Sequence, residues 1–203
     1  MSATLTSTLI AAAIKKAGRS GQSITLTTEF NEILKDMTER YNILPKSATG
    51  ATTADTAYIT MPADYNASRR MILNEDELTW IDPDVYLVWS KTNTDVATIP
   101  MEYTVIKEDS KVYFKNKPSS VWTYTFYYWG IHGAVATDEY HTLEDKYEEV
   151  IIAGTAFKCC QLLKDWDTAK QWEARYERLL ILKAGGNKRL KPVMRSNFWG
   201  QIA

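Results

Sequence analysis

Two histidines are the first candidates for catalysis or metal binding in this chain of 203 residues. His132 stands in the turn-like sequence Gly-Ile-His-Gly (130–133), and His141 stands just before a predicted helix cap. Neither histidine has a cysteine or carboxylate at a spacing that we recognise as a metal site. We therefore predict a loop or capping role for each, with no metal and no cofactor.

The two cysteines are the next candidates for chemistry. Cys159 and Cys160 are adjacent in a predicted helix, where neighbouring side chains point about 100° apart. Adjacent cysteines rarely bond each other, so we expect two reduced thiols that act as small apolar core residues in a reducing compartment. A buried Cys159, far in sequence from both histidines, is also a poor nucleophile.

Phosphate-binding loops and carboxylate pairs give no active site either. Gly130 and Gly133 follow a predicted strand, but no Lys-Ser/Thr pair and no helix start come after them. The acids at 75–77 are typical of a polar turn, and Asp82 and Asp84 are typical of a helix start, although acid pairs alone leave glycosidase chemistry open. We expect a protein that is not an enzyme and has no catalytic residues.

The strand predicted over 121–129 is unusually aromatic. Trp122, Tyr124, Phe126 and Tyr128 alternate onto one of its sides. Such a row could stack on sugar rings or bases, which makes an aromatic-surface carbohydrate-binding module the alternative function. No cations interleave with these four residues, which disfavours nucleic acid. We favour an interface of the β part, packed against the helices or against a neighbouring copy.

Charge is distributed unevenly along the chain. The formal net charge is −1, yet the first 24 residues carry three cations without an acid, and residues 183–203 carry five. The segment between them therefore has a net charge of −9. Basic ends on an acidic body favour head-to-tail contacts between copies or contacts with acidic partners, the alternative being solvated, disordered termini. No apolar run approaches the roughly 18 residues that a membrane span requires.

Hydrophobic periodicity and turn residues predict the elements. We expect helices near 7–17, 29–42, 84–89, 142–163 and 168–182; strands near 58–61, 70–73, 77–81, 101–107, 111–115 and 121–129; and a flexible loop over 47–57. The predicted fold is α+β, an antiparallel or mixed bundle of about four main helices with an inserted small antiparallel β domain and an extended C-terminal tail. The predicted divisions are 1–46 for the N-terminal helices, 47–136 for the β-rich insertion with a short helix near 83–89, 137–184 for the C-terminal helical hairpin and 185–203 for a docking tail.

The two C-terminal helices carry apolar stripes that we assign to packing within the bundle. These residues recur at helical spacing: Tyr147, Ile151, Gly154, Phe157, Trp172, Tyr176 and Leu179. Gly154 costs a helix about 1 kcal/mol relative to Ala, which indicates a close approach of another helix.

The last residues combine cations with large apolar side chains. The cations are Lys188, Arg189, Lys191 and Arg195, and the apolar residues that follow are Phe198, Trp199 and Ile202. No acid occurs in this tail, and it has no core of its own to enter. We predict that it docks in a groove of another protein.

The order of elements resembles the head-to-tail connector, or adaptor, proteins of tailed bacteriophages. Two N-terminal helices are followed by Ile-Thr-Met-Pro-Ala-Asp-Tyr (59–65), Ile-Asp-Pro-Asp (81–84), Ile-Pro-Met-Glu-Tyr (99–103) and a hairpin at 111–118. An aromatic strand ending in Tyr-Tyr-Trp (127–129) then leads to the long helix around 147–163 and a last helix rich in Tyr and Leu. The similarity covers nearly the whole chain.

This resemblance implies a structural virion protein of the phage neck. The family forms a ring of about a dozen copies beneath the portal, joins the DNA-filled head to the tail and extends the DNA channel. The implied partners are the portal protein, copies of the chain itself, a downstream tail or nozzle protein, and DNA that passes without sequence-specific binding, with no membrane. The implied location is the virion, at the head–tail junction, after synthesis in the host cytoplasm. The resemblance also implies that the apolar stripes over 147–162 and 172–182 make the contacts within the ring, and that the tail over 187–203 docks on the portal.

Overall fold

The structure is a computed structural model that describes residues 4–20, 25–92 and 97–185. These residues form five α-helices, a short 3₁₀ turn and nine β-strands. The helices are α1 (Thr6–Lys16), α2 (Thr27–Arg40), α3 (Pro83–Thr92), α4 (Glu148–Leu162) and α5 (Trp166–Ala184), with the turn at Asp145–Tyr147. The strands are β1 (Pro45–Ala51), β2 (Tyr58–Thr60), β3 (Tyr65–Leu73), β4 (Asp76–Trp80), β5 (Ala97–Thr98), β6 (Glu102–Ile106), β7 (Lys111–Phe114), β8 (Lys117–Pro118) and β9 (Thr123–Gly130).

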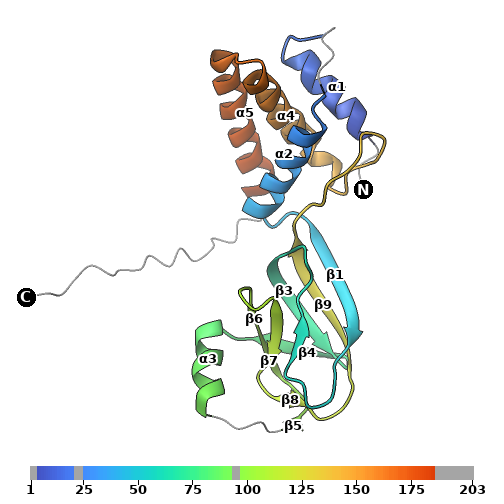
Figure 1. Cartoon of the computed structure of the whole chain (residues 1–203), viewed down its shortest axis with the longest axis vertical. Helices are drawn as coiled ribbons and strands as arrows, with labels where there is room; N and C mark the ends of the chain where they lie inside the picture. Colours follow the sequence, from blue (N-terminus) through green and yellow to red (C-terminus); the bar gives the residue numbers. More distant parts are fainter. Residues whose placement is uncertain (1–3, 21–24, 93–96, 186–203) are drawn as a thin grey trace, which may run out of the picture.

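Helices α1, α2, α4 and α5 pack together as one half of the molecule, and the strands with α3 form the other half (Figure 1). Helix α4 lies between its neighbours and is buried on most of its surface, so its apolar residues supply the centre of the helical core. Cys159 and Cys160 are buried free thiols in this core, as predicted, and burial raises the pKa of both.

Seven strands form one sheet in the order β1-β9-β3-β4-β6-β7-β2. Strands β4 and β6 run parallel, and every other neighbouring pair in this sheet is antiparallel. The sheet curls around its own apolar core (Figure 1), which includes Met71, Leu73, Val112, Phe114 and Phe126. The remaining strands, β5 and β8, form a short parallel pair.

This sheet contradicts the predicted fold class. The chain is a mixed α+β protein dominated by a seven-stranded curled sheet, and a helical bundle with a small antiparallel insertion is wrong. One cause is β1, which occupies much of the predicted loop over 47–57 and pairs with β9 along its whole length. Its Ser, Ala, Thr and Gly residues are small and mostly exposed, so no apolar alternation indicates a strand.

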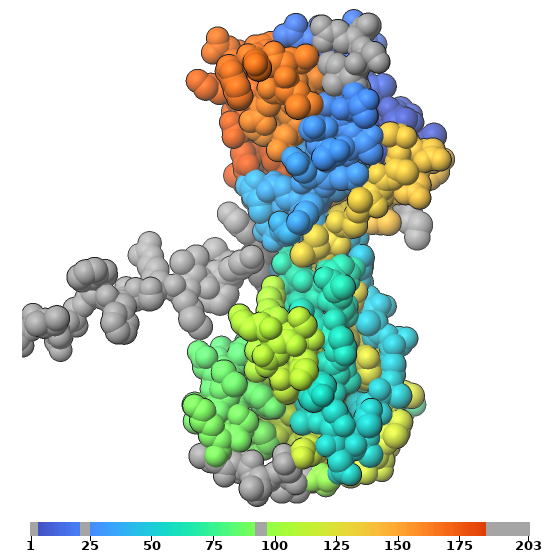
Figure 2. Space-filling view, in the orientation of Figure 1, coloured from blue at the N-terminus to red at the C-terminus, as the bar shows by residue number. Residues whose placement is uncertain are grey.

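The two halves meet at a waist that Figure 2 shows between the helices and the sheet. Thr38, near the end of α2, is fully buried, and its hydroxyl accepts a hydrogen bond of 2.9 Å from the His132 backbone N–H. The Asn66 side-chain amide, from β3, donates to the backbone oxygens of Thr38 (2.9 Å) and Glu39 (3.3 Å). It thereby satisfies carbonyls that the last turn of a helix leaves unpaired.

A second correction concerns the start of the long C-terminal helix, where Thr142 contacts the buried His132 ring. The Thr142 N–H donates a hydrogen bond of 3.2 Å to His132 Nε2, so Nε2 is an acceptor and carries no proton. The ring proton is therefore on Nδ1, which donates to the Gly133 oxygen at 2.6 Å. Burial lowers the pKa of His132, which favours this neutral form. Thr142 was predicted to cap the long helix; instead it contacts the histidine, and α4 begins at Glu148 after the 3₁₀ turn.

Candidate interaction surfaces

The predicted packing stripe lies inside the chain's own helical core. Tyr147, Ile151, Gly154 and Tyr176 are buried there, and Phe157, Trp172 and Leu179 are partly buried against it. The Tyr176 hydroxyl donates to Asp36 Oδ2 at 2.6 Å, and burial, followed by this carboxylate, raises the Tyr176 pKa. The stripe thus holds the helices of one copy together, and its role between copies stays a prediction.

The predicted tail residues lie outside the described residues. These are Lys188, Arg189, Lys191, Arg195, Phe198, Trp199 and Ile202. The last described helical turn of α5 exposes Ile181 and, at 73% exposure, Leu182. An apolar surface therefore lies directly before the basic segment of the sequence.

The aromatic row of β9 faces the core of the sheet. Phe126 and Tyr128 are buried and stack with centroids 5.6 Å apart, while Trp122 and Tyr124 pack against the same core and are partly buried. A platform for sugar rings needs open ring faces, so this row offers no such surface at Phe126 and Tyr128. The Tyr128 hydroxyl donates to Asp64 at 2.8 Å, and burial, followed by that carboxylate, raises the Tyr128 pKa to about 12.

The opposite side of β9 carries aromatic rings beneath arginines. Arg69 lies over the Trp129 ring and Arg70 over the Tyr127 ring, each with its guanidinium carbon 4.6 Å from the ring centroid. A β-bulge between Ser68 and Arg70 brings these neighbouring arginines onto adjacent rings. The sequence alone does not indicate this arrangement, because the cations come from β3 and meet the rings only through strand pairing.

Helix α3 presents several exposed aliphatic side chains on the sheet half. Tyr86 and Trp89 face inward, and the Tyr86 ring lies 5.4 Å from that of Tyr113 in β7. Outward-facing side chains include Val85 and Val88, the latter 66% exposed. Further large hydrophobic residues nearby in the chain are exposed as well: Trp80, Leu87, Ile99 and Met101. Exposed apolar surface of this kind marks protein interaction sites. The sequence predicted the start of this helix, where Asp82 accepts a hydrogen bond from the Asp84 N–H. It did not predict the exposed apolar face.

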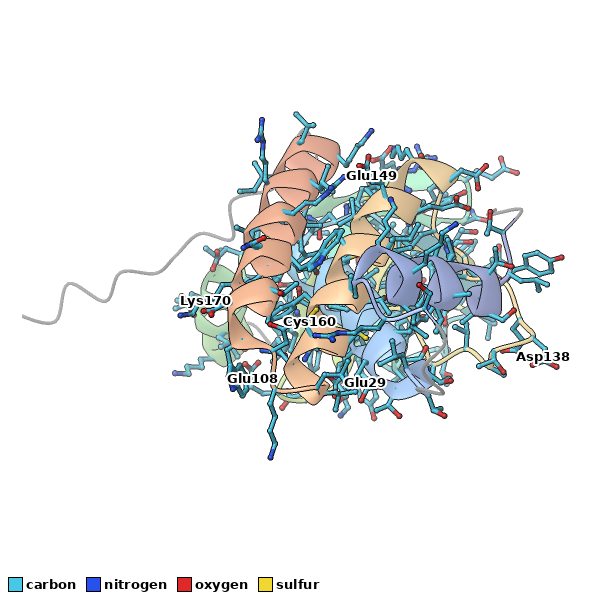
Figure 3. All side chains as sticks on the ribbon, turned by 90° about the horizontal axis from the view of Figure 1, so that it is seen from above. Glu29, Glu108, Asp138, Glu149, Cys160 and Lys170 are labelled. Carbon is cyan, nitrogen blue, oxygen red and sulfur yellow. The ribbon has the colours of Figure 1, made fainter. Side chains whose placement is uncertain are left out.

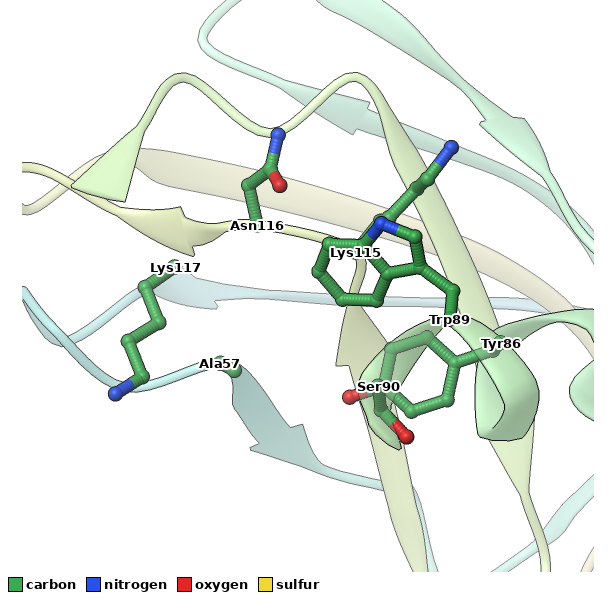
Figure 4. Close-up of a pocket in the computed structure, with 7 residues that line it drawn as sticks. All are labelled: Ala57, Tyr86, Trp89, Ser90, Lys115, Asn116 and Lys117. Carbon is green, nitrogen blue, oxygen red and sulfur yellow. The ribbon is translucent and has the colours of Figure 1, made fainter. Parts of the chain in front are cut away.

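A small pocket lies beneath α3, between this helix and the chain after β7 (Figure 4). Its lining residues are Ala57, Tyr86, Trp89, Ser90, Lys115, Asn116 and Lys117. Its volume is about 50 Å³, whereas small-molecule sites occupy roughly 300–1,000 Å³. The pocket is therefore a crevice under a helix and too small for an organic cofactor.

Two further findings concern the described residues only. Over the ranges 4–20, 25–92 and 97–185, no three His, Cys, Asp or Glu side chains gather as a metal site would require. Within the same ranges, no helix combines the length and the apolar character needed to cross a bilayer.

The exposed apolar surfaces of the two halves are suited to contacts with other proteins. A family model described as the SU10 adaptor protein matches residues 4–196, nearly the whole chain, and the chain therefore belongs to this family of bacteriophage adaptor proteins. The resemblance inferred from the sequence is confirmed at this level, and the chain is a virion structural component. A comparison with curated proteins found no match.

Proposed function

We propose that this chain forms a ring beneath the portal, where it joins the DNA-filled head to the tail and extends the DNA channel. The observation that carries the proposal is the family match over residues 4–196, which includes both halves of the molecule and most of the C-terminal segment. No enzymatic activity and no cofactor form part of this function. The copies would assemble side by side, about a dozen to a ring.

The C-terminal segment is the part that we assign to the portal. Helix α5 ends at Ala184, and the chain beyond it contains four cations, no acid and the apolar residues Phe198, Trp199 and Ile202. Cations steer association with an acidic surface, while aromatic residues supply most of the binding free energy once buried. A segment with both properties fits a groove in another protein.

Charge also suits passage of DNA. The chain between residues 25 and 182 has a net charge of −9. Its acids outnumber its cations, so repulsion of the phosphate backbone would outweigh what counterion release could contribute to binding. DNA would pass such a body without adhering to it.

Helix α3 is our candidate surface for the downstream tail or nozzle protein. Val85 and Val88 are exposed to solvent on this helix, and it lies on the flank of the sheet half, away from the four packed helices (Figure 1). The tail protein would therefore contact a different part of each copy from the part that precedes the portal-docking segment.

Deleting residues 187–203 tests the portal assignment. We expect the truncated chain to keep its helical circular dichroism and to lose affinity for purified cognate portal rings by at least about a hundredfold, because several anchor residues are removed together. Electron microscopy of the mixture with portals shows whether a ring forms.

Two matched variants separate the contributions of the segment. Replacing Lys188, Arg189, Lys191 and Arg195 by Gln should mainly slow association, and replacing Phe198, Trp199 and Ile202 by Ala should mainly speed dissociation. Full-affinity portal binding by the truncated chain would show that the docking role is wrong.

A further inference from the structure

Two unlike surfaces lie on opposite sides of the helical half. Seen from above, Lys170 on α5 and Asp138 in the chain before α4 are at opposite edges of this half (Figure 3). Figure 1 agrees, with α5 on one side and the segment that leads into α4 on the other. Each surface combines exposed apolar residues with charge, and the two charges differ in sign.

The first surface is the outward stripe of α5. Residues at helical spacing form it, and all are exposed: Asp167, Lys170, Gln171, Ala174, Arg178, Ile181 and Leu182. Lys170 and Arg178 make no ion pair with any described residue, unlike Arg175, which pairs with Glu149 at 3.0 Å. The stripe therefore offers two free cations beside two exposed aliphatic side chains.

The second surface is the acidic edge at 137–140. Asp138 and Glu139 are exposed there beside Tyr140, which is 52% exposed, and Asp138 has no cationic partner among the described residues. Helix α1 holds the edge in place, since the Thr6 N–H donates to the Glu139 oxygen at 3.1 Å and the Ser7 N–H to the Thr137 oxygen at 3.0 Å. An exposed segment held in this way is preorganised for binding.

We infer that the α5 stripe of one copy binds the acidic edge of the next copy. The inference rests on the proposed ring and names the two faces that build it. Because the surfaces differ and lie on opposite sides, each contact leaves one surface of each kind free. This is a heterologous arrangement, which gives a ring when the rotation between neighbouring copies closes. Lys170 and Arg178 then face Asp138 and Glu139, and Ile181, Leu182 and Tyr140 lose exposed apolar area.

Charge reversal with mixing tests the contact. The stripe variant carries Lys170→Glu and Arg178→Glu, and the edge variant carries Asp138→Lys and Glu139→Lys. Each variant alone would set like charges against each other, so we expect ring occupancy on purified cognate portals to fall at least about tenfold. In an equal mixture, every stripe can meet an edge of opposite charge in an alternating ring. We therefore expect occupancy to return to within about twofold of the wild type.

Two control variants distinguish loss of this contact from a general effect of charge and from misfolding. Lys15→Glu with Lys16→Glu changes charge equally at exposed positions of α1 and should leave ring occupancy unchanged. Asp138→Lys alone spares the Glu139 carboxylate, which accepts from the Ala136 N–H at 2.9 Å, and tests the edge if the double variant misfolds. Two outcomes would show that this contact is wrong while leaving the proposed function standing. Either each reversed variant forms rings as well as the wild type does, or the equal mixture stays unassembled. A wild-type chain that forms no ring on portals would overturn the proposed function as well.

Discussion

Gly154 is the residue on which the close packing of three helices depends. A Cβ at this position would lie 2.8 Å from Ile33 Cγ2 in α2 and 3.0 Å from Tyr176 Cδ2 in α5. Real Cβ atoms essentially never lie 2.8 Å from a side chain, and 3.0 Å is tighter than most real contacts, so Ile33 or Tyr176 would have to shift. The glycine that the sequence places in an apolar stripe thus lets α4 contact α2 and α5 at once.

Gly154→Ala should therefore destabilise the chain despite its better helix propensity. Alanine gains about 1 kcal/mol over glycine inside a helix, but overpacking a core costs about 1–3 kcal/mol. We expect the free energy of unfolding to fall by about 1 kcal/mol, measured by urea denaturation followed by circular dichroism.

Gly185→Ala is the matched control for this substitution. A Cβ there has no atom within 4 Å, and the φ of −57° suits any residue, so no loss is expected. A Gly154→Ala chain about 1 kcal/mol more stable than the wild type would show that the helices accommodate the methyl group without cost.

At the scale of elements, the contact between α2, β3 and the segment after β9 joins the two halves. The Thr38 hydroxyl makes two hydrogen bonds: it donates to the Leu34 oxygen at 2.9 Å and accepts from the His132 N–H at 2.9 Å. Lys107, beside β6, adds a hydrogen bond of 2.6 Å from its Nζ to the Asn66 oxygen. Buried polar groups in such a network are costly to leave unpaired.

Thr38→Val should weaken this junction while keeping the shape of the side chain. The buried His132 N–H would lose its acceptor, which costs about 1–3 kcal/mol. We expect a loss of that size in the free energy of unfolding, measured by urea denaturation. Thr8→Val, at an exposed position of α1, removes a hydroxyl that no buried group needs and should change stability little. Equal effects of the two substitutions would exclude a special role for Thr38.

At the scale of the whole molecule, the surfaces assigned to partners lie on different parts of the chain. The C-terminal segment follows the helical half, the α5 stripe and the acidic edge lie on its two sides, and α3 lies on the sheet half. One copy could therefore contact the portal, two neighbours and a tail protein without competition between them.

Val85→Ser with Val88→Ser should impair tail attachment but not ring formation. Both side chains are exposed, so the free energy of unfolding should stay the same. The free energy of binding should weaken, because burying each hydroxyl against an apolar partner costs about 1–3 kcal/mol. Complementation of an adaptor-deficient cognate phage, scored by electron microscopy, should show at least about tenfold fewer tailed particles. Lys91→Ser on the same helix serves as the control, and a normal number of tails on the double variant would exclude this face.

The sequence by itself determined the elements whose signals are local. The Asp82-Pro83 start of α3, the strands β6 and β7 and the buried cysteines of α4 all follow from periodicity and turn chemistry. Only the tertiary structure decided how large the sheet is, since β1 has no apolar alternation and becomes a strand by pairing with β9. The same holds for Arg69 and Arg70 over the rings of Trp129 and Tyr127, and for the exposed side of α5. Pairing and exposure depend on residues far apart in the chain, and a local pattern does not contain that information.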